Sequence, residues 1–249
     1  MGSTRKIALV TGVFFIITEV AAIGGFILYG PVLNGADYVV GSGADTRVFL
    51  GAFFEIILAI AVIGTSVTLF PILGRQNEGI ALGYVAARVL EAVVITVGII
   101  SLLSVVTLRQ DLAGAAGANA ASLETVGKSL VALHDWTMLF GPSFAGGVGT
   151  LLLAYLMYSS RLVPRFIAVM GLVGGPLIFA TATGVLFGLY GQFSLWGLVG
   201  ALPIFAWEVA LAVWLIVKGF NPSAFVSDFD KTDINERNKE RDNFIKSIE

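Results

Sequence analysis

Tyr84, Arg88 and Glu91 lie in the middle of a long apolar stretch, at spacings of four and three residues. In a helix these spacings place the three side chains on one face. A charged side chain near the centre of a membrane-spanning helix costs roughly 2.5–3.5 kcal/mol on insertion scales, so such groups face the protein interior rather than lipid. The three residues therefore predict a buried polar site.

Three further acids, Glu19, Glu55 and Glu208, each lie alone near the middle of another apolar stretch, and Trp207 directly precedes the last of them. A helical rise of about 1.5 Å per residue places all four glutamates roughly 12–18 Å from an end of their helices, at one common level. One guanidinium can neutralise one carboxylate, or two through its fork of donors. The remaining carboxyl groups must be protonated, hydrated or bound to a cation.

His134 and Asp135 lie in the outer part of a further apolar stretch. Histidine titrates near neutral pH and an adjacent acid can tune it, but neighbours in a helix point about 100° apart. We expect these two residues at the outer entrance of the acidic layer; the alternative is a structural histidine beside Trp136 as an aromatic anchor at the interface. Pro142, in the same stretch, predicts a kink that frees a backbone carbonyl.

The composition places these residues in a membrane protein. Of 249 residues 57% are hydrophobic and 13% charged, against about 25% charged in soluble domains, and the mean hydropathy is +0.90. A span needs roughly 20 apolar residues. We therefore predict an all-α integral membrane bundle of six transmembrane helices, at residues 7–29, 48–73, 80–108, 130–158, 166–190 and 195–217.

The lysines and arginines of the loops predict the topology. They favour the side of the bundle that carries both ends of the chain, which predicts a multipass protein with both termini in the cytoplasm. Residues 1–220 form the predicted transmembrane domain and residues 221–249, after Asn221-Pro222, a short charged cytoplasmic tail. The first apolar stretch exceeds a signal-peptide core of about 7–15 residues and contains Glu19, so we interpret it as an uncleaved span. The loop at residues 109–128 is expected on the outer side, with a short helix from Ser122.

The amino-acid composition and the lack of certain motifs exclude several classes of partner and cofactor. The chain has no cysteine, which excludes disulfides, thiolate zinc sites and iron–sulfur clusters. A net charge of −2 predicts no nucleic-acid partner. The sequence carries no nucleotide-binding motif, no lysine within a span for a retinal Schiff base, and no haem signature beyond a single histidine.

Two kinds of binding remain open. A divalent cation suits oxygen ligands, and a metal, if present, would be held by Glu55, Glu91, His134 and Glu208. Glycine pairs such as Gly146-Gly147 and Gly174-Gly175, together with Gly184-x-x-x-Gly188, predict close helix packing. These helix faces also suggest a homo-oligomer within the lipid bilayer.

Three functions fit this pattern. The first is transport or binding of a proton, a cation or a cationic small molecule, with the four glutamates as an acidic wall and no enzymatic activity. The second is an intramembrane metal-dependent enzyme that uses the same carboxylates and His134. The third is a structural or regulatory membrane subunit, in which protonated glutamates join helices by hydrogen bonds.

Five motifs occur in order over roughly residues 5–220: Arg75-Gln-Asn-Glu78, Arg88-x-x-Glu91, His134-Asp-Trp136 with Gly141-Pro142, Ser160-Arg-Leu-Val-Pro-Arg165, and Trp207-Glu208. As a set they resemble a bacterial and archaeal family of small multispan proteins, catalogued as a domain of unknown function, number four-three-eight-six. The resemblance implies an integral protein of the cytoplasmic (inner) membrane of a prokaryote. It implies no activity and no catalytic residue.

Overall fold

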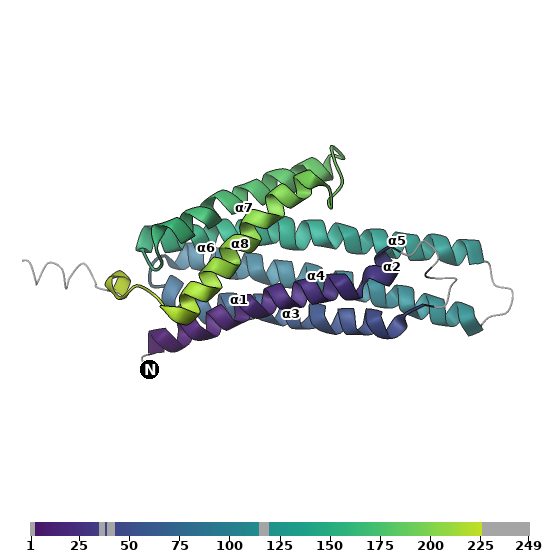
Figure 1. Ribbon diagram of the computed structural model, residues 1–249, viewed down its shortest axis with the longest axis horizontal. Helices are drawn as coiled ribbons and strands as arrows, with labels where there is room; N and C mark the ends of the chain where they lie inside the picture. The colour runs from purple at the N-terminus through teal and green to yellow at the C-terminus, as the bar shows by residue number, and fades with distance from the viewer. Residues whose placement is uncertain (1–2, 35–37, 39–42, 115–119, 226–249) are drawn as a thin grey trace, which may run out of the picture.

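The computed structural model describes residues 3–34, 38, 43–114 and 120–225, and this part of the chain consists of helices and short connecting segments, without a strand (Figure 1). Six spans in it are long and apolar enough to cross a membrane, which confirms the predicted all-α, six-span architecture. The helices are α1 (Ser3–Leu28), α2 (Gly30–Asn34), α3 (Asp45–Leu73), α4 (Glu78–Gly114), α5 (Ala120–Met138), η1 (Leu139–Ala145), α6 (Gly146–Ser160), α7 (Arg165–Leu186), α8 (Leu195–Val217) and η2 (Pro222–Phe225). The helices α5, η1 and α6 form the fourth span together.

The helical boundaries follow the apolar stretches only in part. The sixth span has the predicted bounds, whereas α4 continues to Gly114 and α5 begins at Ala120, so most of the predicted loop at residues 109–128 is helical. The polar residues there find partners within the bundle: Arg109 and Gln110 both donate hydrogen bonds to Asp45 at the start of α3. The predicted tail lies mainly at residues 226–249, outside the described residues.

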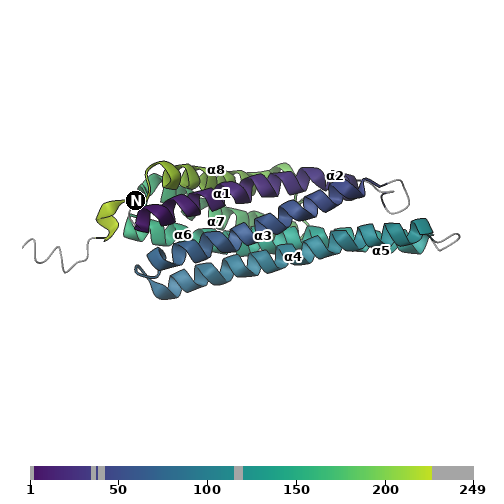
Figure 2. The ribbon, with the colours of Figure 1, turned by 90° about the horizontal axis from the view of Figure 1, so that it is seen from below.

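The spans pack in a closed circuit. Going round the bundle, α1 packs on α3, α3 on α4, α4 on α6, α6 on α7, α7 on α8, and α8 on α1 again. The first and last spans meet at the end of the bundle that holds both Ser3 and Val217 (Figures 1 and 2). There the Arg5 guanidinium donates hydrogen bonds to the carbonyl oxygens of Leu215 and Ile216, at 2.7 and 2.5 Å. A cation is favourable at a helix C-terminus because it offsets the unpaired carbonyls.

The small residues of the spans bring helices together within one chain. A Cβ on Gly175 would lie 2.9 Å from the carbonyl oxygen of Gly147, and one on Gly171 would lie 2.6 Å from the Trp207 ring. Side chains at these positions would separate α6 from α7 and α7 from α8. These glycines therefore have partners in the bundle, and the homo-oligomer stays a prediction.

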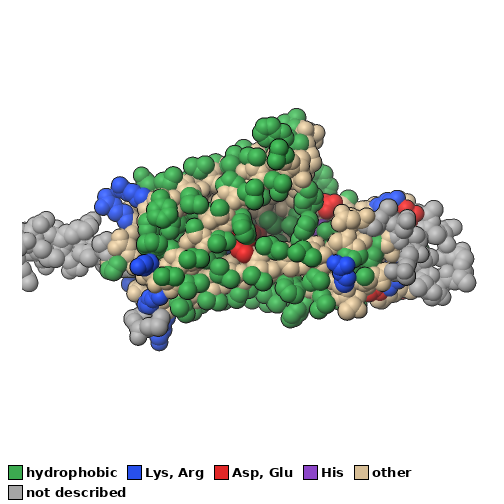
Figure 3. Space-filling model, in the orientation of Figure 1, with side chains coloured by type: hydrophobic (Ala, Val, Ile, Leu, Met, Phe, Trp, Pro, Cys, Tyr) green, Lys and Arg blue, Asp and Glu red, His purple; other side chains and the backbone are tan. Residues whose placement is uncertain are grey.

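Two apolar clusters hold the bundle, and a polar layer separates them. The first contains Phe15 of α1 and Tyr84 of α4; the second contains Ala21 of α1 and Ala92 of α4. Glu19, Arg88 and Glu91 thus lie between the clusters along their helices. Outside, large hydrophobic side chains cover the spans (Figure 3), as a lipid-facing surface requires.

Candidate functional site

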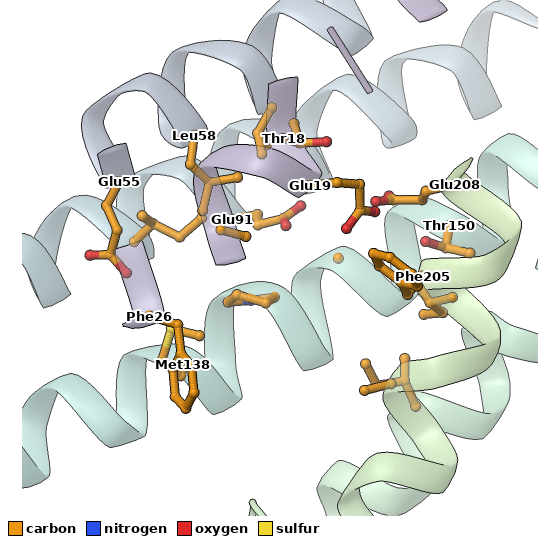
Figure 4. Close-up of a pocket in the computed structure, with 18 of the residues that line it drawn as sticks. Thr18, Glu19, Phe26, Glu55, Leu58, Glu91, Met138, Thr150, Phe205 and Glu208 are labelled. Carbon is orange, nitrogen blue, oxygen red and sulfur yellow. The ribbon is translucent and has the colours of Figure 1, made fainter. Parts of the chain in front are cut away.

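A cavity of about 270 Å³ lies inside the circuit of helices, and all six spans contribute to its lining. Figure 4 shows part of that lining as sticks. Six of the residues predicted for the site line the cavity: Glu19, Glu55, Arg88, Glu91, His134 and Glu208. They form two groups, one around Arg88 and one around His134.

Arg88 is the centre of the first group. Its Nη1 atom lies 3.0 Å from Oε2 of Glu91, one helical turn along α4, and 3.7 Å from Oε1 of Glu208 on α8. All three residues are buried, with exposed fractions of 4%, 6% and 9%. The guanidinium also lies over the ring of Phe15, 5.9 Å from its centroid. Arg88 thus joins α4 to α8 across the interior of the bundle.

Glu19 adds a third carboxyl group to this end of the cavity. Its side chain extends from α1 toward Glu208, and the two carboxyl groups face each other (Figure 4), close enough to form a hydrogen bond when one of them is protonated. Two carboxylates at this distance in an apolar interior cannot both be ionised at low cost. Three carboxyl groups therefore surround one guanidinium, and a proton or another cation must balance the excess.

The second group consists of Glu55, His134 and Tyr29. Nε2 of His134 lies 3.9 Å from Oε1 of Glu55, and the Tyr29 ring meets the imidazole edge-on at 5.7 Å. In the described part of the chain, Oε2 of Glu55 and both imidazole nitrogens make no hydrogen bond within 3.5 Å, and the Tyr29 hydroxyl faces the Glu55 carboxyl group. Unpartnered buried polar atoms are rare and usually mark a bound water, an ion or a functional role. These atoms line the same cavity as the acids around Arg88.

The fourth span is shaped around this cavity by Pro142. Proline lacks the N–H that would bond to the preceding turn. Pro142 lies within a π-helical segment, η1, that interrupts the α-helix of this span. Met138, Pro142 and Gly146 all line the cavity. A Cβ on Gly146 would lie 3.2 Å from Oε1 of Glu91, so the absence of a side chain there leaves space for the carboxylate. Short π-helical insertions are frequent at functional sites.

Three predicted site residues do not line the cavity. Tyr84 is buried in the first apolar cluster, where its hydroxyl lies 3.3 Å from Oγ1 of Thr65. Trp207 packs edge-on against Phe15. The Asp135 side chain is half-exposed on the outer surface, although its Oδ1 lies 3.6 Å from Nδ1 of His134. Only the histidine of the predicted entrance pair therefore reaches the cavity.

The structure places the four predicted metal ligands in two separate groups. Glu55 and His134 form one group, whereas Glu91 and Glu208 lie beside Arg88, whose positive charge opposes a metal ion. Among the described residues, no three His, Asp or Glu side chains are placed to hold a metal together. The set was predicted from distances to the helix ends, and these do not determine which neighbour each acid meets.

Several residues line the cavity that the sequence did not predict for the site, including Tyr29, Thr18, Phe26, Thr150 and Phe205. Tyr29 ends the first apolar stretch and resembles an interfacial aromatic residue. A usable signal was present, because positions 18, 22, 26 and 29 repeat at spacings of four and three and so share a helix face.

A second polar cluster lies at the far end of the bundle, outside the cavity. Asp45 accepts hydrogen bonds from Arg109 and from the Tyr38 hydroxyl, the latter at 2.8 Å. Burial, and then the neighbouring Asp45 carboxylate, raise the pKa of Tyr38 above its usual range. These hydrogen bonds join the start of α3 to the end of α4, so we assign the cluster a structural role.

The fold and the composition define an all-helical multispan membrane protein, with a mixed-charge cavity between its spans. Comparison with known families gives a more specific result: residues 10–219 match the family described as "Domain of unknown function (DUF4386)", and the chain belongs to this family. No curated protein and no solved structure matches the chain.

Proposed function

We propose that this protein binds a cation in its central cavity and transports it across the membrane, the cation being a proton or a cationic small molecule. The observation that carries the proposal is the charge imbalance around Arg88: the carboxyl groups of Glu19, Glu91 and Glu208 share one guanidinium. In an interior of low dielectric this excess is compensated by protons or by a bound cation.

The cavity also has the size and walls for a small organic cation. About 270 Å³ is close to the lower limit of ordinary ligand pockets, and one liquid water occupies about 30 Å³. Phe26, Tyr29 and Phe205 contribute aromatic rings to the lining. Aromatic faces attract ammonium groups, with about 2 kcal/mol per contact when both are desolvated.

The orientation in the membrane belongs to the same proposal. Arg5, Arg75, Arg161, Arg165 and Lys218 flank spans at the end of the bundle where α1 begins and α8 ends (Figure 1). The preference of positively charged loops for the cytoplasm supports cytoplasmic termini, and we place the protein in the inner membrane of a prokaryote.

Glu19→Gln is the sharpest test. Glu19 has another acid opposite it, so the neutral amide relieves repulsion and should leave the fold intact. Protein in liposomes, under an inside-negative potential, should take up radiolabelled tetramethylammonium or protons, the latter followed with a trapped pH dye. Glu19→Gln should abolish the uptake, and Glu78→Gln, at an exposed position on α4, should leave it unchanged.

The result that contradicts the proposal is equally definite. If wild-type liposomes take up neither tetramethylammonium nor protons faster than empty liposomes, the protein is not such a transporter. If uptake occurs and Glu19→Gln retains it, the carboxyl groups have a structural role and the cation passes elsewhere.

A further inference from the structure

An apolar groove extends the acidic cavity to the surface of the bundle. The groove has a volume of about 430 Å³ and lies between α1, η1 and the α7–α8 hairpin. Ala22, Phe26, Met138, Pro142, Ile178 and Ala201 line both the groove and the cavity, so the two spaces adjoin each other. None of the described residues that line the groove is charged.

The mouth of the groove carries exposed hydrophobic side chains. Ile23 of α1, Leu198 of α8 and Phe193 of the turn between α7 and α8 line this groove and are 50%, 46% and 61% exposed. Figure 3 shows this face hollowed, with acidic atoms visible in the hollow among hydrophobic side chains. An opening of this kind admits molecules from the lipid rather than from water.

Two aromatic rings meet across the mouth. Phe26 of α1 and Phe193 of the turn before α8 lie with their centroids 5.4 Å apart. In lipid no hydrophobic force holds such a pair together, because acyl chains solvate the rings as well as the protein does. The pair can therefore separate at little cost when an apolar chain enters.

We propose that the ligand is an amphipathic cation, an amine or quaternary ammonium with an alkyl or aromatic tail, that enters sideways from the bilayer. The charged head lies in the cavity against Glu19 and Glu208, and the tail lies in the groove beside Ala201. This inference rests on the proposed function, which supplies the cation site, and adds the tail and the route. A bare proton or metal ion would require no apolar groove.

The test is photolabelling of the full chain in lipid nanodiscs with decyltrimethylammonium that carries a diazirine at mid-chain. Mass spectrometry should locate the label on the groove, at Ile23, Phe193 or Leu198. An excess of unlabelled decyltrimethylammonium should lower this labelling about tenfold, and decyl sulfonate should not.

A matched pair of variants tests the position of the tail. Ala201→Phe fills the groove where it joins the cavity, and should lower the labelling about tenfold, the equivalent of about 1.4 kcal/mol. Ala86→Phe is the control, because Ala86 lines another lipid-facing groove, beside Phe140 and Phe144, whose described lining residues carry no acid. This substitution should leave the labelling at Ile23 unchanged.

The outcomes separate this inference from the proposed function. Equal labelling of both grooves, or equal competition by the cationic and anionic chains, overturns the amphipathic ligand. If tetramethylammonium uptake still depends on Glu19 in that case, the cation site stands and only the tail and the lateral route fall. If uptake and specific labelling are both absent, both proposals fall.

Discussion

Replacement of Arg88 by methionine tests the charge balance of the cavity most directly. The guanidinium lies 3.0 Å from one carboxylate oxygen and 3.7 Å from another. At an effective dielectric constant of about 20, Coulomb attraction at these distances amounts to about 5.5 and 4.5 kcal/mol before desolvation is subtracted. Desolvation of three buried groups offsets most of this attraction.

The net loss on removing one partner of a buried ion pair is about 3–5 kcal/mol, because the other charge is left uncompensated. We expect R88M to lower the free energy of unfolding by this amount. The measurement is reversible unfolding in mixed micelles at neutral pH, with increasing denaturing detergent. R75M, at an exposed arginine between α3 and α4, is the matched control and should change stability by less than about 0.5 kcal/mol.

A double-mutant cycle gives the refuting result. In R88M/E91Q the isolated charge of Glu91 is replaced by a neutral amide, so the double variant should be more stable than the sum of the single losses predicts, by about 1–3 kcal/mol. Strict additivity, or a loss below about 1 kcal/mol in R88M, would show that the carboxyl groups are already neutral without Arg88. The reasoning about excess negative charge would then be wrong.

Three further substitutions test other parts of the structure. Gly146→Ala places a Cβ 3.2 Å from the Glu91 carboxylate. We expect this substitution to lower the free energy of unfolding by about 1–3 kcal/mol and to reduce tetramethylammonium uptake. If both values stay unchanged, Gly146 is not part of the site. Asp45→Asn weakens the hydrogen bond that Arg109 donates to this residue. Amide hydrogen exchange should become faster at the adjoining ends of α3 and α4, by the equivalent of about 1–3 kcal/mol in the free energy of local opening. Exchange elsewhere should stay constant. Arg5→Met removes the cation from the C-terminus of α8 and should lower the free energy of unfolding by about 1–2 kcal/mol. Amide hydrogens in the last turn of α8 should exchange faster than in the wild type. Equal exchange in the two proteins would contradict a capping role for Arg5.

The six spans could be predicted because a bilayer requires long apolar helices, which leave a strong signal in the sequence. The ends of the helices could not be predicted so well. Asp45 and Arg109 are 64 residues apart in the sequence, and their contact joins the ends of α3 and α4 beyond the apolar stretches.

The part of the site that lies within a single helix could be predicted from the sequence. Arg88 and Glu91 lie one turn apart on one helix, so their pairing needs no knowledge of the other spans. Glu55 shows the limit: counting along helices gives a depth but not a direction, and this acid meets His134 instead of Arg88. Asp135 and Trp207 do not line the cavity for the same reason, since the rotation of each span is determined by packing.

The contact between α1 and α8 has a consequence for biosynthesis. Ribosomes deliver the spans in order, so the first one waits in the membrane until the sixth has been made. During that interval Glu19 lacks the helix that carries Glu208, and the interior of the unfinished bundle stays open to lipid. We therefore expect chains truncated before Leu195, which lack the partners of Glu19 and Arg5, to be less stable in the membrane than the full chain.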